Sequence, residues 1–298
     1  MFDPNLIIYF NGKYQKLSDT KISPMTHSLH YGTGVFEGIR SYQIKKGVGI
    51  FRLRDHINRL FYSAEKLKLK IKEDKEEIMD ICREVIKRNK LKNSYLRPLI
   101  FLDDSSLGMT TETNKTITYI TAFPWSKYLK NEVSVKISSY RRISEHSTFC
   151  DAKISGHYVN SLLANLETKE TPYDEPLLLD HRGAIAEGAV ANIFFIKENE
   201  LHTPQTGKIL PGITRDSVIF LAKKLNYRVI EREIFPQEIE NFQGAFFTGT
   251  ASEITIIKKI ALENNQEINF DTATPLPIKE KFDEVVGVDS ADEFNWFN

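Results

Sequence analysis

Lys153 is the residue of this sequence whose neighbours most favour covalent chemistry. It lies between Ala152 and Ile154, whereas most lysines of the chain lie in runs of mixed charge. Burial disfavours the charged form and lowers the pKa of a lysine, which leaves its amine free to attack a carbonyl carbon. A half-exposed lysine at a helix start is the ordinary alternative, so the interpretation depends on what else the chain supplies.

Three further stretches carry residue types that suit a phosphorylated cofactor. Glu187 lies among small residues, and a buried glutamate needs a positive partner. Residues 210–215 predict a helix start, whose N–H groups and positive dipole end suit a phosphate. Residues 247–252 predict a strand end with hydroxyls and a glycine. Taken singly, each has a structural explanation: a surface glutamate, a helix cap and a turn.

Together with Lys153, these stretches match the needs of pyridoxal phosphate. This cofactor requires a lysine that binds it covalently, an acid that keeps its pyridine nitrogen protonated, and a phosphate site made from a helix N-terminus and hydroxyls. Because the sequence supplies all three, it predicts pyridoxal phosphate as the cofactor.

The elements that must position these residues fall into two parts. In the first, two hairpins, two amphipathic helices and two further strands predict an α+β lobe. The expected hairpins turn at Asn11-Gly12 and Lys45-Lys46-Gly47, the helices begin at caps Asp55 and Asp74, and the strands run over 95–102 and 115–123. Asp74 with Glu77 forms an acidic variant of the capping box.

The second part is richer in short strands, which predicts a barrel-like or mixed sheet with peripheral helices. We expect strands over 133–139, 176–180, 192–196, 227–234, 245–248 and 253–258, a turn at 181–183, and helices that begin at Ser161, Thr214, Gln237 and Ile278. The domain boundaries that follow are 1–122 for a small N-terminal domain, 123–132 for a connecting loop and 133–298 for a large C-terminal domain.

Composition excludes several classes of function. Forty basic and forty acidic residues cancel, so neither a nucleic acid nor a membrane surface is an expected partner. The two cysteines, Cys82 and Cys150, have no metal-type spacing, and no metal is expected. Without a signal-like start or a long apolar run, a cytoplasmic location is expected.

Longer motifs show a resemblance that extends over nearly the whole chain. They are 9–12, 30–32, 35–40, Phe51-Arg52 with Arg59, 95–100, 122–125, Ala152-Lys153 with Tyr158, Glu187-Gly188, 210–215 and 249–251. In these motifs the chain resembles the branched-chain amino acid aminotransferases, in class IV of the pyridoxal-phosphate-dependent aminotransferases. The resemblance implies a two-domain α+β fold of type IV, with a small α/β domain and a larger pseudo-barrel domain.

The implied activity is transamination of leucine, isoleucine and valine with 2-oxoglutarate. In it Lys153 would hold the cofactor and move the proton between the substrate α-carbon and the cofactor C4′. Glu187 would pair with the pyridine nitrogen, and Tyr158 with the ring hydroxyl. The implied phosphate ligands are Arg59, Ile213, Thr214 and Thr250.

The resemblance also implies how amino acid and 2-oxo acid substrates are bound. Tyr31, Phe36, Trp125 and Tyr128 would form an apolar wall, with Gly38 leaving room for the side chain. Polar contacts would come from Arg40, Tyr95, Arg97, Thr250 and Ala251. Tyr31 and the loop of Leu107, Gly108 and Met109 would reach a neighbouring subunit's site, so the resemblance implies a homodimer.

Some positions depart from the family pattern. Val190-Ala191 precedes Asn192 where glycine and glutamate are usual, and Ile154-Ser155-Gly156-His157 follows Lys153 where small residues and asparagine are commoner. The alternatives on the same fold are a D-amino acid aminotransferase and an aminodeoxychorismate lyase. A relative without catalytic activity that binds the cofactor or a protein is the alternative outside enzymes, and the retention of Lys153, Glu187, Arg59 and Thr250 argues against it.

Overall fold

The chain forms two compact units. The computed structural model describes residues 2–111, 113–125 and 130–297. One unit comprises Met1–Ser126, Ala152–His157 and Val286–Asn298, and the other comprises Lys127–Asp151 and Tyr158–Val285. The sequence led us to expect one connection at 123–132, whereas the chain also returns to the first unit at 152–157 and at 286–298.

The first unit is built on an antiparallel sheet. Over the described ranges this sheet has seven strands, in the order β2-β1-β7-β6-β4-β5, with β3 paired to β6. The strands are β1 Ile7–Phe10, β2 Lys13–Lys16, β3 Gly34–Phe36, β4 Ile39–Ile44, β5 Gly47–Ile50, β6 Ser94–Leu102 and β7 Thr116–Pro124. Both expected hairpins are confirmed. Positive φ at Asn11 and Gly12 explains the tight first turn.

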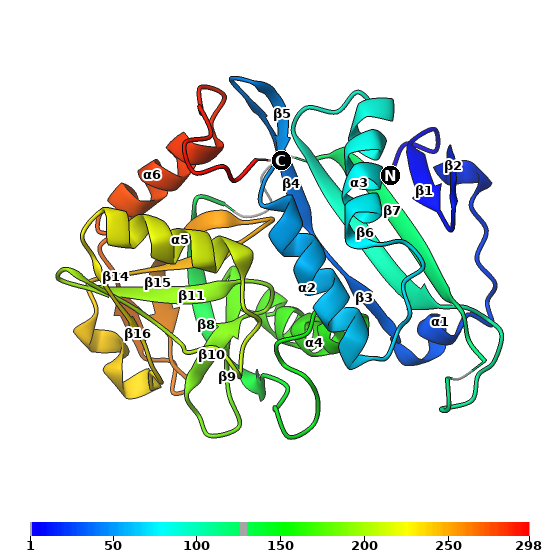
Figure 1. Ribbon diagram of the computed structural model, residues 1–298. Coiled ribbons are helices and arrows are strands. Elements are labelled where there is room, and N and C mark those ends of the chain that lie inside the picture. The colour runs from blue at the N-terminus through cyan, green and yellow to red at the C-terminus, as the bar shows by residue number, and fades with distance from the viewer. Residues whose placement is uncertain (1, 112, 126–129, 298) are drawn as a thin grey trace. The chain divides into compact units, whose positions relative to one another are not determined.

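Helices α2, Leu53–Lys66, and α3, Lys75–Arg88, pack against this sheet (Figure 1). Their apolar faces join the sheet in one buried cluster. The capping box of Asp74 and Glu77 is confirmed. The prediction that Asp55 caps α2 is wrong, because the helix begins after Arg52, whose backbone is left-handed. Asp55 lies in the first turn of the helix, where it accepts a hydrogen bond from Arg52 Nε at 2.6 Å. Short helices η1, Leu17–Asp19, α1, His27–Tyr31, and η2, Ser155–His157, complete the unit.

The C-terminal segment explains the unusual backbone at Arg52. Arg52 N donates to Trp296 O at 2.6 Å, and Phe51 pairs with Phe297. A Cβ added at Gly49 would lie 2.7 Å from the Cβ of Phe297, so only glycine fits this approach. The last residues therefore cover the end of β5 and fix the start of α2, a constraint from the far end of the chain.

The second unit is built on a mixed sheet. Across the residues with described positions it has nine strands, in the order β10-β9-β8-β15-β14-β11-β12-β13, with β16 paired to β15. The strands are β8 Glu132–Arg141, β9 Glu175–Leu179, β10 Ile185–Gly188, β11 Asn192–Lys197, β12 Glu200–Thr203, β13 Arg228–Glu231, β14 Gly244–Gly249, β15 Glu253–Ala261 and β16 Glu267–Asn269. The pairs β8–β9, β8–β15 and β12–β13 are parallel. The expected mixed sheet is confirmed.

Helices surround this second sheet, as expected. They are α4 Tyr158–Lys169, α5 Ile213–Lys224, η3 Pro236–Asn241 and α6 Leu276–Val286. Helix α4 contacts β8 and β9, and α5 contacts β13 and β14. The helix expected from Gln237 is a short 3-10 helix that begins at Pro236. The short strands β3, β12 and β16 were not predicted from the sequence.

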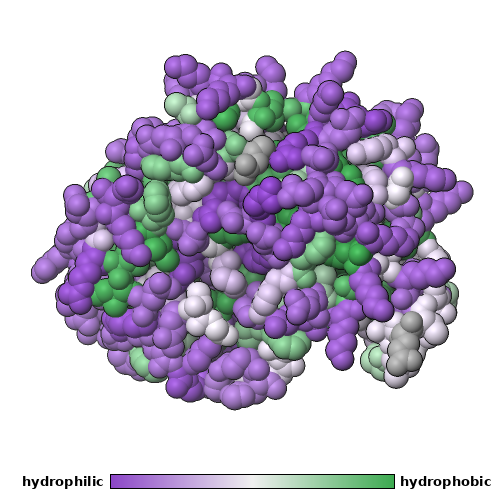
Figure 2. Space-filling model, in the orientation of Figure 1, coloured by the Kyte–Doolittle hydropathy of each residue, from purple (hydrophilic) through white to green (hydrophobic). Residues whose placement is uncertain are grey.

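Hydrophilic residues cover most of the face seen in Figure 2, and apolar residues appear on it in separate patches. Among the described residues, no helix is both long and apolar enough to span a bilayer.

The first residue of β9 gives the second unit a dependence on pH. Burial, with a smaller contribution from Asp174, raises the pKa of Glu175 to about 7. In the unfolded chain this carboxyl has the ordinary pKa of a glutamate, 4.5. The folded state holds the proton more tightly than the unfolded state. The contribution of Glu175 to stability is therefore fully present below pH 4.5 and is lost as the pH rises to about 7.

We therefore expect Glu175→Gln to raise the free energy of unfolding at pH 8 by about 1–2 kcal/mol and to change it little at pH 4. Urea unfolding at both values measures this difference. Glu170→Gln, at an exposed position of the same unit, is the control and should change neither value. An equal effect of Glu175→Gln at both pH values would contradict the assignment.

Candidate active site

The backbone on both sides of Lys153 is held within the first unit. Lys153 N donates to Ser63 Oγ on α2 at 2.9 Å, and Lys153 O accepts from Phe36 N at 3.2 Å. The flanking residue Ile154 pairs with Val35 of β3. Lys153 itself is partly buried, and its Nζ lies 5.0 Å from the centroid of the Phe36 ring. The lysine is thus fixed at its base, next to an aromatic face.

A buried charged cluster joins α2 to the segment between β3 and β4. Glu37 is fully buried, and its two carboxylate oxygens accept from Arg59 Nε at 2.7 Å and from Arg59 Nη2 at 2.9 Å. His56 Nδ1 lies 2.7 Å from Glu37 Oε2. The two parallel hydrogen bonds from Arg59 to one carboxylate fix the plane of the Arg59 guanidinium. The sequence predicted Arg59 as a phosphate ligand but gave no sign of the carboxylate and imidazole that orient it.

The cluster sets the ionisation of its members. Burial raises the pKa of Glu37, but Arg59 and His56 outweigh it, and the net effect is a pKa far below the usual range. Burial lowers the pKa of His56, and Arg59 and Lys153 add to this, so the net shift is downward despite Glu37. His56 is therefore neutral at pH 7, and Glu37 is an anion that one arginine neutralises.

Several of the predicted substrate residues come together in the first unit. The Arg97 guanidinium lies 4.7 Å from the Phe36 ring and 5.4 Å from the Tyr95 ring, and the Trp125 ring lies 4.8 Å from Tyr95. A Cβ on Gly38 would lie 1.8 Å from the Tyr95 hydroxyl. The space above Gly38 is therefore filled by Tyr95, which differs from our expectation that this glycine leaves room for a substrate.

Arginine nitrogens in this cluster suit an anion. Arg97 Nη2 donates to Tyr95 Oη at 3.4 Å, while Arg97 Nε is buried without a hydrogen-bond partner among the described residues. Arg40 is buried, and its guanidinium lies 4.9 Å from the Tyr42 ring. A buried guanidinium N–H without an acceptor is costly, and a carboxylate supplies one.

Tyr31 and the loop of Leu107 and Met109 are joined by a histidine that the sequence did not single out. The His27 ring lies 4.7 Å from the Tyr31 ring, and His27 Nε2 lies 3.2 Å from Gly108 O. His27 is buried, whereas Tyr31 is 45% exposed and Met109 is 71% exposed. These two side chains thus point away from their own core.

Glu187 in the second unit has the positive partner that its burial requires. Arg142 Nε donates to Glu187 Oε1 at 2.5 Å, and Asn192 Nδ2 donates to Oε2 at 3.1 Å. Burial lowers the pKa of Arg142, but the Glu187 carboxylate raises it more, so the guanidinium stays charged. The sequence missed Arg142 because it lies 45 residues before Glu187.

Asn192 also fixes the start of α5. Its Nδ2 donates to Leu210 O at 3.0 Å, and a Cβ on Gly212 would lie 2.0 Å from its Oδ1. Gly212 is the N-cap of α5, and no side chain caps the helix. The predicted phosphate ligands Ile213 and Thr214 are the first residues of this helix. The positive end of α5 is therefore held against the strand that supports Glu187.

The strand end after β14 adds hydroxyl groups. Thr248 Oγ1 and Ser252 Oγ are buried and have no hydrogen-bond partner among the residues with described positions. They flank the predicted ligands Thr250 and Ala251, both partly buried. Unpartnered buried donors, a helix N-terminus and an anchored carboxylate fit the phosphate and the protonated ring nitrogen of pyridoxal phosphate.

The remaining predicted residues include Tyr158 and Tyr128. Tyr158 begins α4 and contributes to the raised pKa of Arg142. Tyr128 lies outside the described residues. Val190, a departure from the family pattern, is 43% exposed, which places its side chain outside the packed core.

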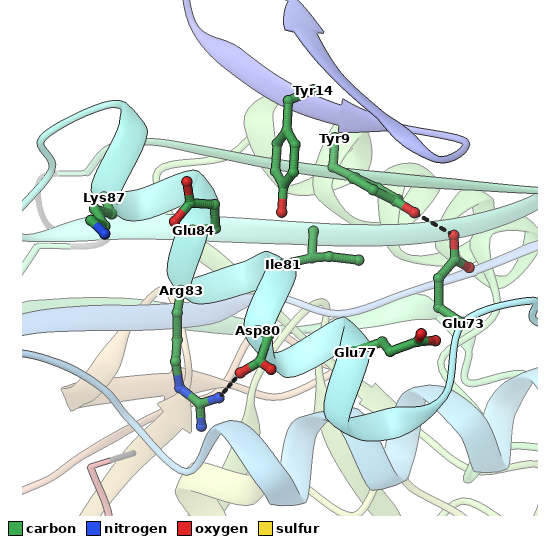
Figure 3. A pocket seen from close by; sticks show the side chains of 9 residues that line it. All are labelled: Tyr9, Tyr14, Glu73, Glu77, Asp80, Ile81, Arg83, Glu84 and Lys87. Carbon is green, nitrogen blue, oxygen red and sulfur yellow. Dashed lines mark hydrogen bonds and ion pairs between the residues drawn. The ribbon is translucent and has the colours of Figure 1, made fainter.

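A surface groove of about 660 Å³ on the first unit is a different feature (Figure 3). It lies between α3 and the hairpin of β1 and β2, and Tyr9 Oη donates to Glu73 there at 2.7 Å. None of the predicted site residues lines it. It therefore has no part in the chemistry described above.

Comparisons with known proteins assign the family. The model of the family described as amino-transferase class IV matches residues 34–260. This range includes Lys153, Glu187 and Thr250. The chain belongs to the class IV aminotransferases. Members of this family are enzymes that use pyridoxal phosphate.

Three relatives indicate the branch of the family. The branched-chain-amino-acid aminotransferase of Escherichia coli strain K12 is 40% identical over 260 residues, covering 85% of this chain and 84% of its own. The solved branched-chain aminotransferase of Thermoproteus uzoniensis with norvaline is 31% identical, with a TM-score of 0.92 over 98% of both chains. The branched-chain enzyme of T.th., complexed with N-(5'-phosphopyridoxyl)-L-glutamate, is 33% identical, with a TM-score of 0.91 over 98% of this chain and 97% of its own.

These likenesses confirm the expected two-domain α+β fold of this aminotransferase.

The contribution of the Glu187–Arg142 ion pair to the stability of the aminotransferase can be tested directly. We expect Arg142→Met to lower the free energy of unfolding by about 3–5 kcal/mol, because it leaves a buried carboxylate without its counter-charge. Thermal and urea unfolding measure this loss.

The neighbouring residue gives a matched control. Arg141 Nη2 pairs with Glu263 at the surface, at 2.8 Å. Arg141→Met should therefore cost less than about 1 kcal/mol. An equal loss of unfolding free energy in the two variants would show that the buried Arg142 pair stabilises the protein no more than the exposed Arg141 pair does.

Proposed function

We propose that this aminotransferase transfers the amino group of leucine, isoleucine and valine to 2-oxoglutarate, giving branched-chain 2-oxo acids and L-glutamate. The observation that carries the proposal is the 40% identity to the Escherichia coli branched-chain enzyme over 85% of the chain. Norvaline and a phosphopyridoxyl derivative of glutamate, named with two solved relatives, represent the two substrate classes.

Lys153 is the proposed catalytic residue. When bound, pyridoxal phosphate supplies an electron-withdrawing ring that stabilises negative charge on the substrate α-carbon. Lys153 binds the cofactor covalently in the resting enzyme, and once displaced its Nζ carries the proton between the α-carbon and C4′. The proposal is supported by the fixed backbone at Lys153, which limits the amine to a short range of positions.

The other cofactor roles follow from charge. Glu187 accepts from the protonated pyridine nitrogen, and Arg142 keeps the carboxylate charged and oriented. Tyr158 donates to the ring oxygen. The phosphate is bound by Arg59, by the N–H groups of Ile213 and Thr214, and by the Thr250 hydroxyl.

The substrate roles divide between apolar and polar groups. Phe36, Tyr31, Trp125 and Tyr128 bind the branched side chain, and Gly38 sets the position of Tyr95. Carboxylates are bound by Arg40, Tyr95, Arg97, Thr250 and Ala251. The buried Arg97 Nε supports this role, since a carboxylate would satisfy it.

We further propose that the enzyme is a cytoplasmic homodimer. Tyr31, Leu107 and Met109 would serve the neighbouring subunit's site. This is supported by the exposure of Tyr31 and Met109 within a loop system that His27 holds. Their exposure leaves both side chains available to contact a partner subunit.

The absorbance of the bound cofactor tests the proposed reaction. The purified protein should show the visible band of a lysine-bound pyridoxal phosphate. L-leucine and L-glutamate should each convert it to pyridoxamine phosphate, whereas D-alanine should not. Lys153→Ala should bind the cofactor without catalysing this conversion.

Two outcomes would overturn the assignment. Conversion by D-alanine alone would support a D-amino acid aminotransferase, and release of pyruvate from aminodeoxychorismate would support the lyase. Absence of the band after addition of pyridoxal phosphate would remove the roles given to Lys153 and Glu187.

The orientation of Arg59 by Glu37 also has a measurable effect. We expect Glu37→Gln to raise the dissociation constant for pyridoxal phosphate by about tenfold or more, because the amide no longer fixes the guanidinium by charge. Fluorescence titration of the apoprotein measures it. Glu76→Gln, which removes the exposed partner of Arg54, is the control and should leave the constant unchanged. Equal affinity in all three proteins would show that Glu37 does not position the phosphate ligand.

A further inference from the structure

Two imidazoles and a carboxylate gather on the second unit, outside the residues used above. Glu145, His146 and His181 each offer one ligand atom, and these three atoms lie within 4.8 Å of one another. Glu145 Oε2 lies 3.6 Å from His181 Nδ1. The rings of His146 and His181 are 5.3 Å apart, at an interplanar angle of 70°. The three side chains thus converge on one small volume of solvent.

The backbones that carry these side chains are ordered by their own hydrogen bonds. Ser144 O accepts from Ser147 N at 2.9 Å and from Thr148 N at 3.2 Å, which closes the turn that presents Glu145 and His146. Asp180 Oδ1 accepts from Arg182 N at 2.8 Å and from Ala184 N at 2.9 Å, which closes the turn that presents His181.

A further bond joins the two turns. Arg142 N donates to Leu179 O at 2.8 Å. The spacing of the three side chains is therefore set by the fold, and exposure leaves them free to rotate toward a common ligand.

The local charges favour a cation. The nearby cations are already paired, since Lys208 Nζ contacts Asp180 Oδ2 at 3.1 Å and Glu233 Oε1 at 2.7 Å, and Arg182 pairs with Glu233. Asp180, Glu233 and Glu145 together outnumber Lys208 and Arg182 by one charge.

We propose that Glu145, His146 and His181 bind one divalent transition-metal ion of the zinc and nickel class. Two nitrogen ligands and one oxygen ligand suit these ions, whereas calcium and magnesium prefer oxygen alone. Ligand atoms about 2.0–2.2 Å from an ion lie roughly 3.3 Å apart in a tetrahedron, close to the spacing of Glu145 and His181. Water completes the coordination.

The bound ion restrains the segment that carries Arg142. It links the turn of 145–146, which follows Arg142, to the turn of 181–183, which precedes the strand of Glu187. The site therefore stabilises the connection between the two residues of the buried pair. This inference stands on the second unit alone and does not depend on the proposed substrates.

Titration calorimetry with nickel chloride tests the site on the holoenzyme, in a buffer free of phosphate, amino acids and chelators. We expect one site per chain with a dissociation constant on the order of micromolar, and a loss of about tenfold or more in His146→Gln and in His181→Gln. His30→Gln, which removes an exposed histidine of the first unit, should bind as the parent does.

Copper provides a second, spectroscopic readout. With one equivalent of Cu²⁺, the electron paramagnetic resonance spectrum of the parent should show coupling to two imidazole nitrogens, and each of the two cluster variants should lose one. Equal affinity in the parent and both variants, or an equal loss in His30→Gln, overturns the proposal. So does a parent spectrum without nitrogen coupling.

Discussion

The buried pair of Glu187 and Arg142 is the interaction on which the second unit's part of the site depends. An ionised carboxylate is stable there because a guanidinium and the Asn192 amide donate to it at 2.5 and 3.1 Å. Asn192 also receives the close approach of Gly212, so the same amide positions the first turn of α5. A carboxylate for a ring nitrogen and a helix end for a phosphate are thus placed by one network of side chains.

The first unit also contains a buried carboxylate, which has different partners. Glu37 is fully buried, and both Arg59 and His56 contact it. Because the pKa of His56 is lowered, Arg59 supplies the counter-charge, and its two hydrogen bonds to Glu37 fix the plane of the guanidinium. In both units, then, a buried anion determines where a functional group can point. The difference is that Glu187 is itself the functional group, whereas Glu37 orients one.

The sequence predicted elements wherever the signal was local. The capping box of Asp74, the Asn11-Gly12 turn and the run of strands around residue 250 each depend on neighbours in the chain. By contrast, the predicted start of α2 was wrong, because contacts with Trp296 and Phe297, at the other end of the chain, set the backbone at Arg52. Lys153 and Glu187 could be found because they sit in recognisable motifs. Arg142, His27 and His56 could not, since each acts through a partner that only the fold brings near.

The stretch from Arg142 to Lys153 shows why such residues matter. Its first residue neutralises Glu187 in the second unit, and its last is the lysine held by Ser63 in the first. Between them, Cys150 Sγ donates to Ile143 O, and the turn of Glu145 and His146 faces His181. An ion bound at that turn would hold the stretch near its start, without touching either end. Ordering the middle of a connection reduces the number of conformations available to both of its ends. The bound ion would therefore help to position Arg142 and Lys153 and would not add a reaction of its own.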